Sequence, residues 1–293
     1  MTERDVWTVQ RIMEWTQAWF SEHGINSPRL DTEVLLAHVL GKDRVYLYTH
    51  YDRPLSSQER DAFRVLVKRR AKREPVAYIL GEKEFYGRPF KVTQDTLVPR
   101  PETEHLIDGV VKWVAERRVE GTMTSPCRIL DLGTGTGCIA ITLAAELSGV
   151  EVTAVDISGA TLAVARENAR TLGVSESIQF REGDLFAPVM GERFDIIVSN
   201  PPYVEEKVRA ALEPEVTEFE PAGALFAGSD GMEIIRRLIP EAVEHLVAGG
   251  LLAVEFGSTQ RAAMEGEMGQ PWAKFWIEED LQGHPRALFA ERS

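Results

Sequence analysis

Four consecutive residues, Asn200, Pro201, Pro202 and Tyr203, have the composition of a holder for a planar NH2 group. They follow the largely apolar run 195–199, which is typical of a buried strand. Neither proline offers an N–H and each residue before a proline is pushed to extended geometry, so the strand must end there with its carbonyls expected to be unpaired. A side-chain amide and a freed carbonyl can accept the two protons of an NH2 group while the ring stacks on its face. Methylation of an amide or amino nitrogen requires such a holder.

A glycine-rich motif upstream favours this chemical interpretation over a plain proline-rich turn after a core strand. The run 128–132 predicts a short buried strand, and the helical pattern 139–147 begins soon after it. Alternating glycines between the two allow a tight turn and let a ligand approach the backbone closely. The intervening loop consists of Gly133, Thr134, Gly135, Thr136 and Gly137.

The next predicted strand, 152–155, ends at Asp156, about twenty residues past the glycines, where a carboxylate can accept both hydroxyls of a ribose. Two nucleoside cofactors fit such a site. A dinucleotide fingerprint has the spacing G-x-G-x-x-G and holds a pyrophosphate, whereas this chain has G-x-G-x-G with Asp131 just before it. A carboxylate there repels phosphate and suits a positively charged ligand with a free amino group. The sequence therefore favours S-adenosylmethionine.

A third candidate element lies between these motifs. Residues 178–182 alternate like a strand and lead to Asp184, Leu185 and Phe186. An adenine could lie against Leu185 while the Asp184 region offers an acceptor to its exocyclic amine. Leu185 and Phe186 fit an ordinary core equally well.

Composition bounds the class of protein. The chain has 293 residues, 44% of them hydrophobic, which is ample for the core of one or two domains. No apolar run approaches membrane-spanning length and residues 1–5 do not resemble a signal peptide, so a cytoplasmic protein with no membrane partner is expected. The net charge of −13 argues against a grip on nucleic acid through phosphates. Cys127 and Cys138 lack metal-ligand spacing, so no metal site is expected.

One basic stretch, residues 53–73, runs against the overall acidity. Helical periodicity places several of its cations on one exposed face. A solvated helix face is one interpretation, and a docking patch for an acidic protein partner, or for RNA near it, is the other. The cations are Arg53, Arg60, Arg64, Lys68, Arg69, Arg70, Lys72 and Arg73.

Apolar periodicity divides the chain into three parts. Residues 1–74 carry helical stripes and predict a small helical domain. Residues 75–100 hold two short β-prone runs around Gly87, which predict a hairpin in a linker. From 101 to 293 strands and helices alternate, as in a parallel sheet covered on both faces. The last two strands, 275–277 and 287–289, are predicted to pair antiparallel.

Local signals refine these parts. The run 56–59, Ser-Ser-Gln-Glu, predicts the N-cap that opens the basic helix. The helix 233–247 is predicted to end at a glycine pair before the strand 251–255. The run 100–104 precedes another helix, and its charges would either cap that helix or lie along the cofactor cleft.

With these residues in place, the chain resembles the HemK/PrmC family, the protein-(glutamine-N5) methyltransferases that modify peptide chain release factors. The resemblance covers nearly the whole length. Its segments are residues 81–90, 98–104, 131–137, 199–203 and 220–228.

The resemblance implies a Rossmann-like class I methyltransferase domain, a mostly parallel seven-stranded sheet with an antiparallel last strand, after a helical domain that recognises the substrate. It implies that the glycine loop lines the methionine moiety, that Asp156 binds the ribose, and that Leu185 flanks the adenine. Asp184 and Asn200 belong to the same cofactor-binding set. The Asn-Pro-Pro-Tyr motif would hold the glutamine amide of the release factor's Gly-Gly-Gln motif. A monomer that needs no direct nucleic-acid contact is expected.

Other functions stay open at this point. Enzymes that methylate a glutamine of a ribosomal protein share the Asn-Pro-Pro-Tyr motif, although residues 84–90 and 100–104 look more like the release-factor branch. An adenine-N6 methyltransferase would use the same holder for an exocyclic amine, but it would need a basic groove. A non-catalytic module that binds a nucleoside and a protein would not need all three motifs together.

Overall fold

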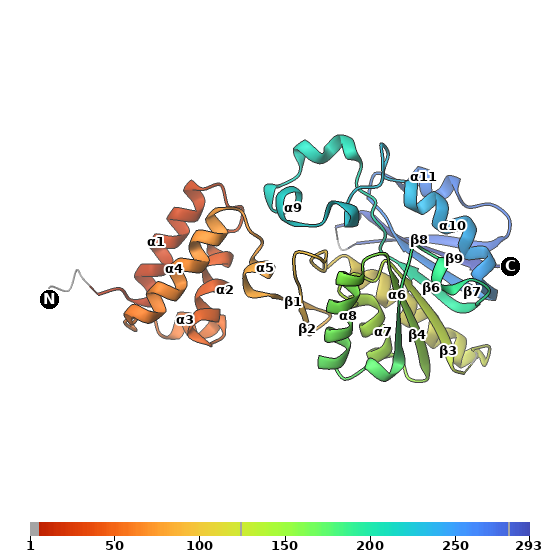
Figure 1. Cartoon of the computed structure of the whole chain (residues 1–293), viewed down its shortest axis with the longest axis horizontal. Coiled ribbons are helices and arrows are strands. Elements are labelled where there is room, and N and C mark those ends of the chain that lie inside the picture. The colour runs from red at the N-terminus through yellow and green to blue at the C-terminus, as the bar shows by residue number, and fades with distance from the viewer. Residues whose placement is uncertain (1–5, 124, 281) are drawn as a thin grey trace. The chain divides into compact units, whose positions relative to one another are not determined.

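The computed structural model describes residues 6–123, 125–280 and 282–293, and it divides the chain into two compact units (Figure 1). The first unit contains residues up to Gly81 together with Glu213–Phe219, and the second contains Glu82–Leu212 and Glu220–Ser293. The expectation about residues 1–5 lies outside the described ranges, and the boundaries at residues 74 and 100 stay predictions. Within those ranges no helix has both the length and the apolarity that a membrane crossing demands.

The first unit is a helical bundle around one apolar core; in Figure 1 its part up to residue 81 is drawn in red to orange and its later segment, 213–219, in teal. Its helices are α1 (Val9–Glu22), α2 (Pro28–Leu40), α3 (Arg44–Thr49), α4 (Ser57–Ala71) and α5 (Val76–Leu80), with α9 (Pro214–Phe219) added from later in the chain. The predicted N-cap of α4 is confirmed, since the Ser56 hydroxyl accepts from the Glu59 N–H while the Glu59 carboxylate accepts from the Ser56 N–H.

The basic stretch 53–73 is not simply a solvated face. Arg70 is buried, and its guanidinium donates to Asp31 over 2.6 Å and to Glu215 over 2.7 Å. Arg73 donates to the same Glu215 carboxylate over 2.8 Å. The expectation of an exposed face is wrong for Arg70, because periodicity shows which residues share a helix face but not which distant carboxylates lie opposite it.

The predicted hairpin opens the second unit. Strands β1 (Glu82–Phe85) and β2 (Arg88–Lys91) pair antiparallel across Tyr86 and Gly87. Both turn residues have positive φ, 50° and 68°, as a two-residue hairpin turn requires. The hairpin buries Phe85 and Phe90 in the core of the second unit.

A seven-stranded sheet forms the centre of the second unit, in the order β5-β4-β3-β6-β7-β9-β8. Only β9 runs against its neighbours among these strands, which confirms the predicted parallel sheet with an antiparallel last strand. The strands are β3 (Cys127–Leu132), β4 (Val150–Asp156), β5 (Ile178–Glu182), β6 (Phe194–Ser199), β7 (Leu246–Glu255), β8 (Trp272–Glu279) and β9 (Pro285–Arg292).

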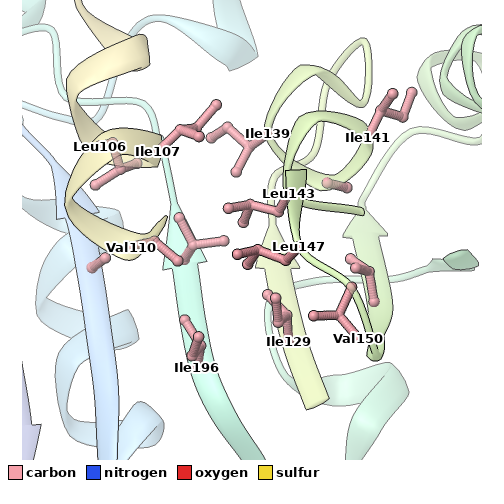
Figure 2. Close-up of a cluster of buried hydrophobic side chains, with 14 of the residues drawn as sticks. Leu106, Ile107, Val110, Ile129, Ile139, Ile141, Leu143, Leu147, Val150 and Ile196 are labelled. Carbon is pink, nitrogen blue, oxygen red and sulfur yellow. The ribbon is translucent and has the colours of Figure 1, made fainter. Parts of the chain in front are cut away.

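Alternating side chains bury both faces of this sheet. Ile129 and Ile196 face a core shared with α6 (Thr103–Glu120) and α7 (Cys138–Glu146), as Figure 2 shows. Their neighbours Leu130 and Ile197 face a second core, shared with α10 (Glu233–His245). The other helices of this unit are α8 (Gly159–Thr171) and α11 (Arg261–Gly266). A sheet covered on both sides leaves its strand ends as the place for a ligand.

One predicted boundary needs correction. The helix expected over 233–247 ends at His245, because β7 begins at Leu246, before the glycine pair. Leu246 pairs with Phe194, and the register then shifts before Ile196 pairs with Leu251. An irregularity of this kind accommodates extra residues in one strand. It allows the strand to begin directly after the helix, and the hydrophobic pattern does not show where that change occurs.

Replacing Arg70 with alanine should lower the free energy of unfolding by about 3 kcal/mol, because the buried Asp31 would lose its charged partner while the half-buried Glu215 would keep only Arg73. Urea unfolding of the full chain, followed by circular dichroism, measures this change. Arg64 of the same helix pairs with Asp61 on the exposed surface and provides the matched control. Arg64→Ala should cost less than about 1 kcal/mol, and equal losses in the two variants would contradict the prediction.

Candidate functional site

Parallel pairing brings the sequence motifs to one edge of the sheet. Leu132 of β3 is in register with Val155 of β4 and with Ser199 of β6, and Ser199 is in register with Val254 of β7. The residues that directly follow these positions in the four strands therefore form a row at the carboxyl ends of the strands. They are Asp156, Gly133, Asn200 and Glu255.

A cavity of about 430 Å³ lies at this edge, within the second unit. Most of the predicted site residues line it. They are Gly133, Thr134, Gly135, Thr136, Asp156, Asp184, Leu185, Asn200 and Pro202. Among the described residues, three predicted site residues do not line this cavity. They are Gly137, Pro201 and Tyr203.

The glycine loop adopts a conformation that other residues would strain. Gly133 and Gly135 have φ of 70° and 57°, in the left-handed region. No described atom lies within 4 Å of a Cβ added to Gly133, so conformation alone accounts for this glycine and leaves room for a ligand. Gly137 precedes α7, and an added Cβ would lie 2.8 Å from Ile141 Cδ1. Gly137 also has a left-handed φ of 82°, so both its conformation and its packing against α7 account for this glycine.

Asp131 is a fully buried carboxyl beneath this loop. Its Oδ2 accepts from the Thr134 hydroxyl over 2.6 Å and from the Ala140 N–H over 3.2 Å. Its Oδ1 is buried with no hydrogen-bond partner among the residues that the structure describes. Burial raises the pKa of Asp131 to about 7, against the lowering effect of those two hydrogen bonds. A cation near the loop would stabilise its ionised form.

Asp156 lines the cavity at the end of β4. Its Oδ2 accepts from the Gly135 N–H and its Oδ1 from the Ser158 N–H, each over 3.0 Å. These bonds hold the carboxylate still, and each oxygen keeps a further lone pair for a ligand hydroxyl. Burial raises the pKa of Asp156 from its usual value.

The structure separates the two residues that the sequence left ambiguous. Phe186 is buried in the core, whereas Leu185 lines the cavity with a left-handed φ of 45°. Asp184 also lines the cavity, and its carboxylate accepts from Arg237 over 2.6 Å. Sequence reasoning missed Ile157, which follows Asp156, lines the cavity and is 72% exposed. An exposed isoleucine beside a conspicuous acid was its only signal.

The amide of Asn200 has a defined orientation. Its Nδ2 donates to the Thr103 hydroxyl over 3.0 Å, while its Oδ1 accepts no hydrogen bond within the described ranges. The Pro201 carbonyl is likewise free of described donors, as expected. The Tyr203 carbonyl instead accepts from the Gln260 side chain over 3.0 Å, so the expectation of unpaired carbonyls is wrong there. Gln260 is buried and comes from a distant segment, so no local signal could identify it.

Tyr203 is tied to Glu255, which sequence reasoning also missed. The Tyr203 hydroxyl donates to Glu255 Oε1 over 3.0 Å. Burial and the neighbouring carboxylate raise the pKa of Tyr203, so the phenol stays neutral. Burial raises the pKa of Glu255 to about 7, although the Thr103 and Tyr203 hydroxyls act to lower it.

The run 100–104 contributes to the cleft as well as to α6. Arg100 and Thr103 line the cavity, and Arg100 donates to the buried Glu220 over 2.6 Å. Glu104 accepts from the Tyr86 N–H and so holds the hairpin turn. Arg100 therefore belongs to the cavity, whereas Glu104 belongs to the hairpin.

Comparison with known proteins places this site in a class. Residues 11–81 match the PrmC N-terminal domain, and residues 120–218 match the methyltransferase small domain. The solved hMettl16 catalytic domain, in complex with MAT2A 3'UTR hairpin 6, has a TM-score of 0.55 and 19% identity, covering 78% of this chain and 81% of that one. The fold and the matched domains define a Rossmann-like methyltransferase.

Relatives narrow the class to a family. A release factor glutamine methyltransferase of Geobacter sulfurreducens is 42% identical over 267 residues, covering 91% of this chain and 90% of the relative. One of Rhodopirellula baltica is 40% identical over 290 residues, covering 98% and 97%. The chain belongs to the release factor glutamine methyltransferase family. It is an enzyme, and its methyl donor is S-adenosylmethionine.

Binding of S-adenosylmethionine should release a proton near neutral pH, because a positively charged ligand favours the ionised form of Asp131. With a pKa of about 7, this carboxyl is mostly protonated at lower pH and must lose its proton on binding. The affinity should therefore fall by up to about tenfold for each pH unit below 7 and level off above it. Titration calorimetry in buffers of different ionisation enthalpy counts the protons.

Two variants assign this proton. Asp131→Asn should bind the cofactor more weakly at high pH and should lose the proton release. Glu255 also has a pKa near 7, so Glu255→Gln is the matched control and should keep it. Wild-type proton release in Asp131→Asn would exclude Asp131 as its source.

Proposed function

We propose that this enzyme methylates the side-chain N5 of the glutamine in the Gly-Gly-Gln motif of a peptide chain release factor. The names of its relatives support this substrate. The observation that carries the proposal is the orientation of Asn200, whose Nδ2 is engaged by Thr103 and whose Oδ1 is left as an acceptor beside the cavity. We also propose that the enzyme acts as a cytoplasmic monomer and needs no direct nucleic-acid contact.

The cavity residues fit S-adenosylmethionine. Asp131 lies outside the cavity wall, but its buried and unpartnered Oδ1 beneath the loop 133–137 suits the positive charge of the methionine moiety that this loop would line. Asp156 has lone pairs left for the two ribose hydroxyls. Leu185 and Ile157 offer apolar surface to the adenine, with Asp184 at the same wall. When bound, the cofactor supplies an electrophilic methyl group carried on a sulfonium.

The substrate amide needs help with alignment because its nitrogen lone pair is delocalised into the carbonyl. Asn200 Oδ1 and the Pro201 carbonyl would each accept one of its two N–H protons and so fix the plane of the amide. Hydrogen bonding to both protons also raises the electron density on nitrogen. Pro202 removes a backbone donor and stiffens the corner, which keeps the two acceptors in place.

Tyr203 would complete the holder by stacking on the amide plane and excluding water. Its ring is held at the hydroxyl end by Glu255 and at the backbone by Gln260. Its neutral phenol is no general base, and the amide nitrogen needs none before transfer. One amide proton is lost after the nitrogen has gained its methyl group.

Asn200→Ala should lower turnover by about 100-fold or more while cofactor affinity stays near that of wild type, because the substitution removes an oriented acceptor of the substrate amide. The assay incubates enzyme and labelled S-adenosylmethionine with a release factor, and mass spectrometry locates the added methyl. Calorimetry measures cofactor binding separately.

The substrate control is a release factor whose Gly-Gly-Gln glutamine is replaced by alanine, which should accept no methyl group. Labelling of a ribosomal protein or of adenine in nucleic acid, with the release factor left unmodified, would replace the proposed substrate. Near-normal turnover by Asn200→Ala would remove the role given to Asn200.

A further inference from the structure

Two side chains of the Asn-Pro-Pro-Tyr motif converge on one buried carboxyl. Glu255 ends β7 and is 1% exposed. Because β6 and β7 are parallel and Ser199 is in register with Val254, Glu255 lies beside Asn200 on the same side of the sheet. The Tyr203 hydroxyl donates to Glu255 Oε1 over 3.0 Å.

Thr103 connects the same carboxyl to Asn200. This threonine begins α6 and is 1% exposed. Its Oγ1 accepts from Asn200 Nδ2 over 3.0 Å, and its hydroxyl lies close enough to Glu255 to lower the pKa of that carboxyl. Two hydrogen bonds, from Asn200 to Thr103 and from Tyr203 to Glu255, therefore meet where the Thr103 hydroxyl influences the Glu255 carboxyl.

The donor and acceptor properties of these groups determine the direction of the hydrogen bonds between them. With a pKa of about 7, Glu255 is mostly ionised above that pH. An ionised carboxylate only accepts hydrogen bonds, so a hydroxyl next to it must then donate. Once the Thr103 hydrogen points to Glu255, the Thr103 oxygen can only accept, and the NH2 end of Asn200 must face it. The amide oxygen of Asn200 is then directed away from Thr103. The same carboxylate sets the Tyr203 hydroxyl as a donor.

We propose that Glu255 and Thr103 are positioning residues that hold Asn200 with its oxygen toward the substrate and Tyr203 with its ring in place. The inference rests on the proposed function of the Asn-Pro-Pro-Tyr corner. An asparagine amide presents nearly the same shape in either orientation, yet only one of them accepts protons from a substrate NH2 group. The buried carboxylate removes that ambiguity.

Stability alone does not explain a carboxylate at this position. Glu255 Oε2 is buried without a hydrogen-bond partner in the described part of the chain. Of the charged groups that influence it, Glu102 opposes its ionisation and Arg286 favours it, and burial outweighs the favourable contacts. Ionised Glu255 is thus less favourable in the folded protein than in the unfolded chain. A neutral residue of the same shape should therefore fold at least as well above pH 7, which leaves positioning of the neighbouring hydroxyls as a role for the charge.

Two substitutions at Thr103 separate positioning from packing. Thr103→Ser keeps the hydroxyl and loses a methyl group, whereas Thr103→Val keeps the shape and loses the hydroxyl. At about pH 8 and saturating cofactor, positioning predicts a kcat within about threefold of wild type for Ser and about thirtyfold lower for Val. The opposite order, an active Val variant and an impaired Ser variant, would show a packing role and overturn the proposal.

Glu255→Gln tests the carboxylate itself. A glutamine has the same shape, but its NH2 group can donate to Thr103 and so reverse the direction of the hydrogen bonds to Asn200. We expect kcat to fall about tenfold, with a Tm at about pH 8 no more than about 2 °C below wild type. A large loss of Tm with kcat retained would show that Glu255 serves the fold instead.

A measurement without substrate distinguishes this proposal from the proposed function. The side-chain NH2 signals of Asn200, identified by their absence in Asn200→Ala, should exchange slowly with solvent in wild type and Thr103→Ser and at least about tenfold faster in Thr103→Val. If wild type failed to methylate release factors while this pattern held, only the proposed function would fall. Equal exchange in all three proteins would refute the positioning role, whatever the substrate.

Discussion

The parallel register of β4, β3, β6 and β7 is the constraint on which the site depends. Parallel strands all end at one edge, and the pairing of Leu132, Ser199 and Val254 puts the residue after each of them in a single row. This pairing makes neighbours in space of three segments that are far apart in the chain: the glycine loop 133–137, the Asn-Pro-Pro-Tyr motif and Glu255. A slip of one residue in any of these pairs would move its side chain to the other face of the sheet.

The same edge concentrates carboxyls in a poorly solvated place. Asp131 and Glu255 each have one oxygen that is buried without a described partner, and burial raises the pKa of both to about 7. For each group the folded protein holds the proton more tightly than the unfolded chain, so their contribution to stability declines as the pH rises from about 4.5 to 7. A cationic ligand would stabilise the ionised form of Asp131. Ionised Glu255 would determine the direction of the hydrogen bonds around it.

Local motifs allowed much of the fold and part of the site to be predicted from the sequence. The glycine loop, Asp156 and the proline corner are contiguous patterns whose backbone requirements are visible in the residue types. The contacts that orient them are not local, since Thr103 lies 97 residues from Asn200, and Glu255 lies 52 residues from Tyr203. Only the tertiary fold brings such pairs together.

The charge of the protein helps to distinguish between the substrates that the acceptors of residues 200–203 could bind. A planar NH2 group of adenine and one of glutamine offer the same two protons, so the corner alone does not choose between them. Nucleic acid must also find cations for its phosphates, and the chain carries a net charge of −13. Its most basic stretch has Arg69, Arg70 and Arg73 already paired with carboxylates in the described structure. Cations committed in this way are poor ligands for phosphate, which favours an amide on a protein loop.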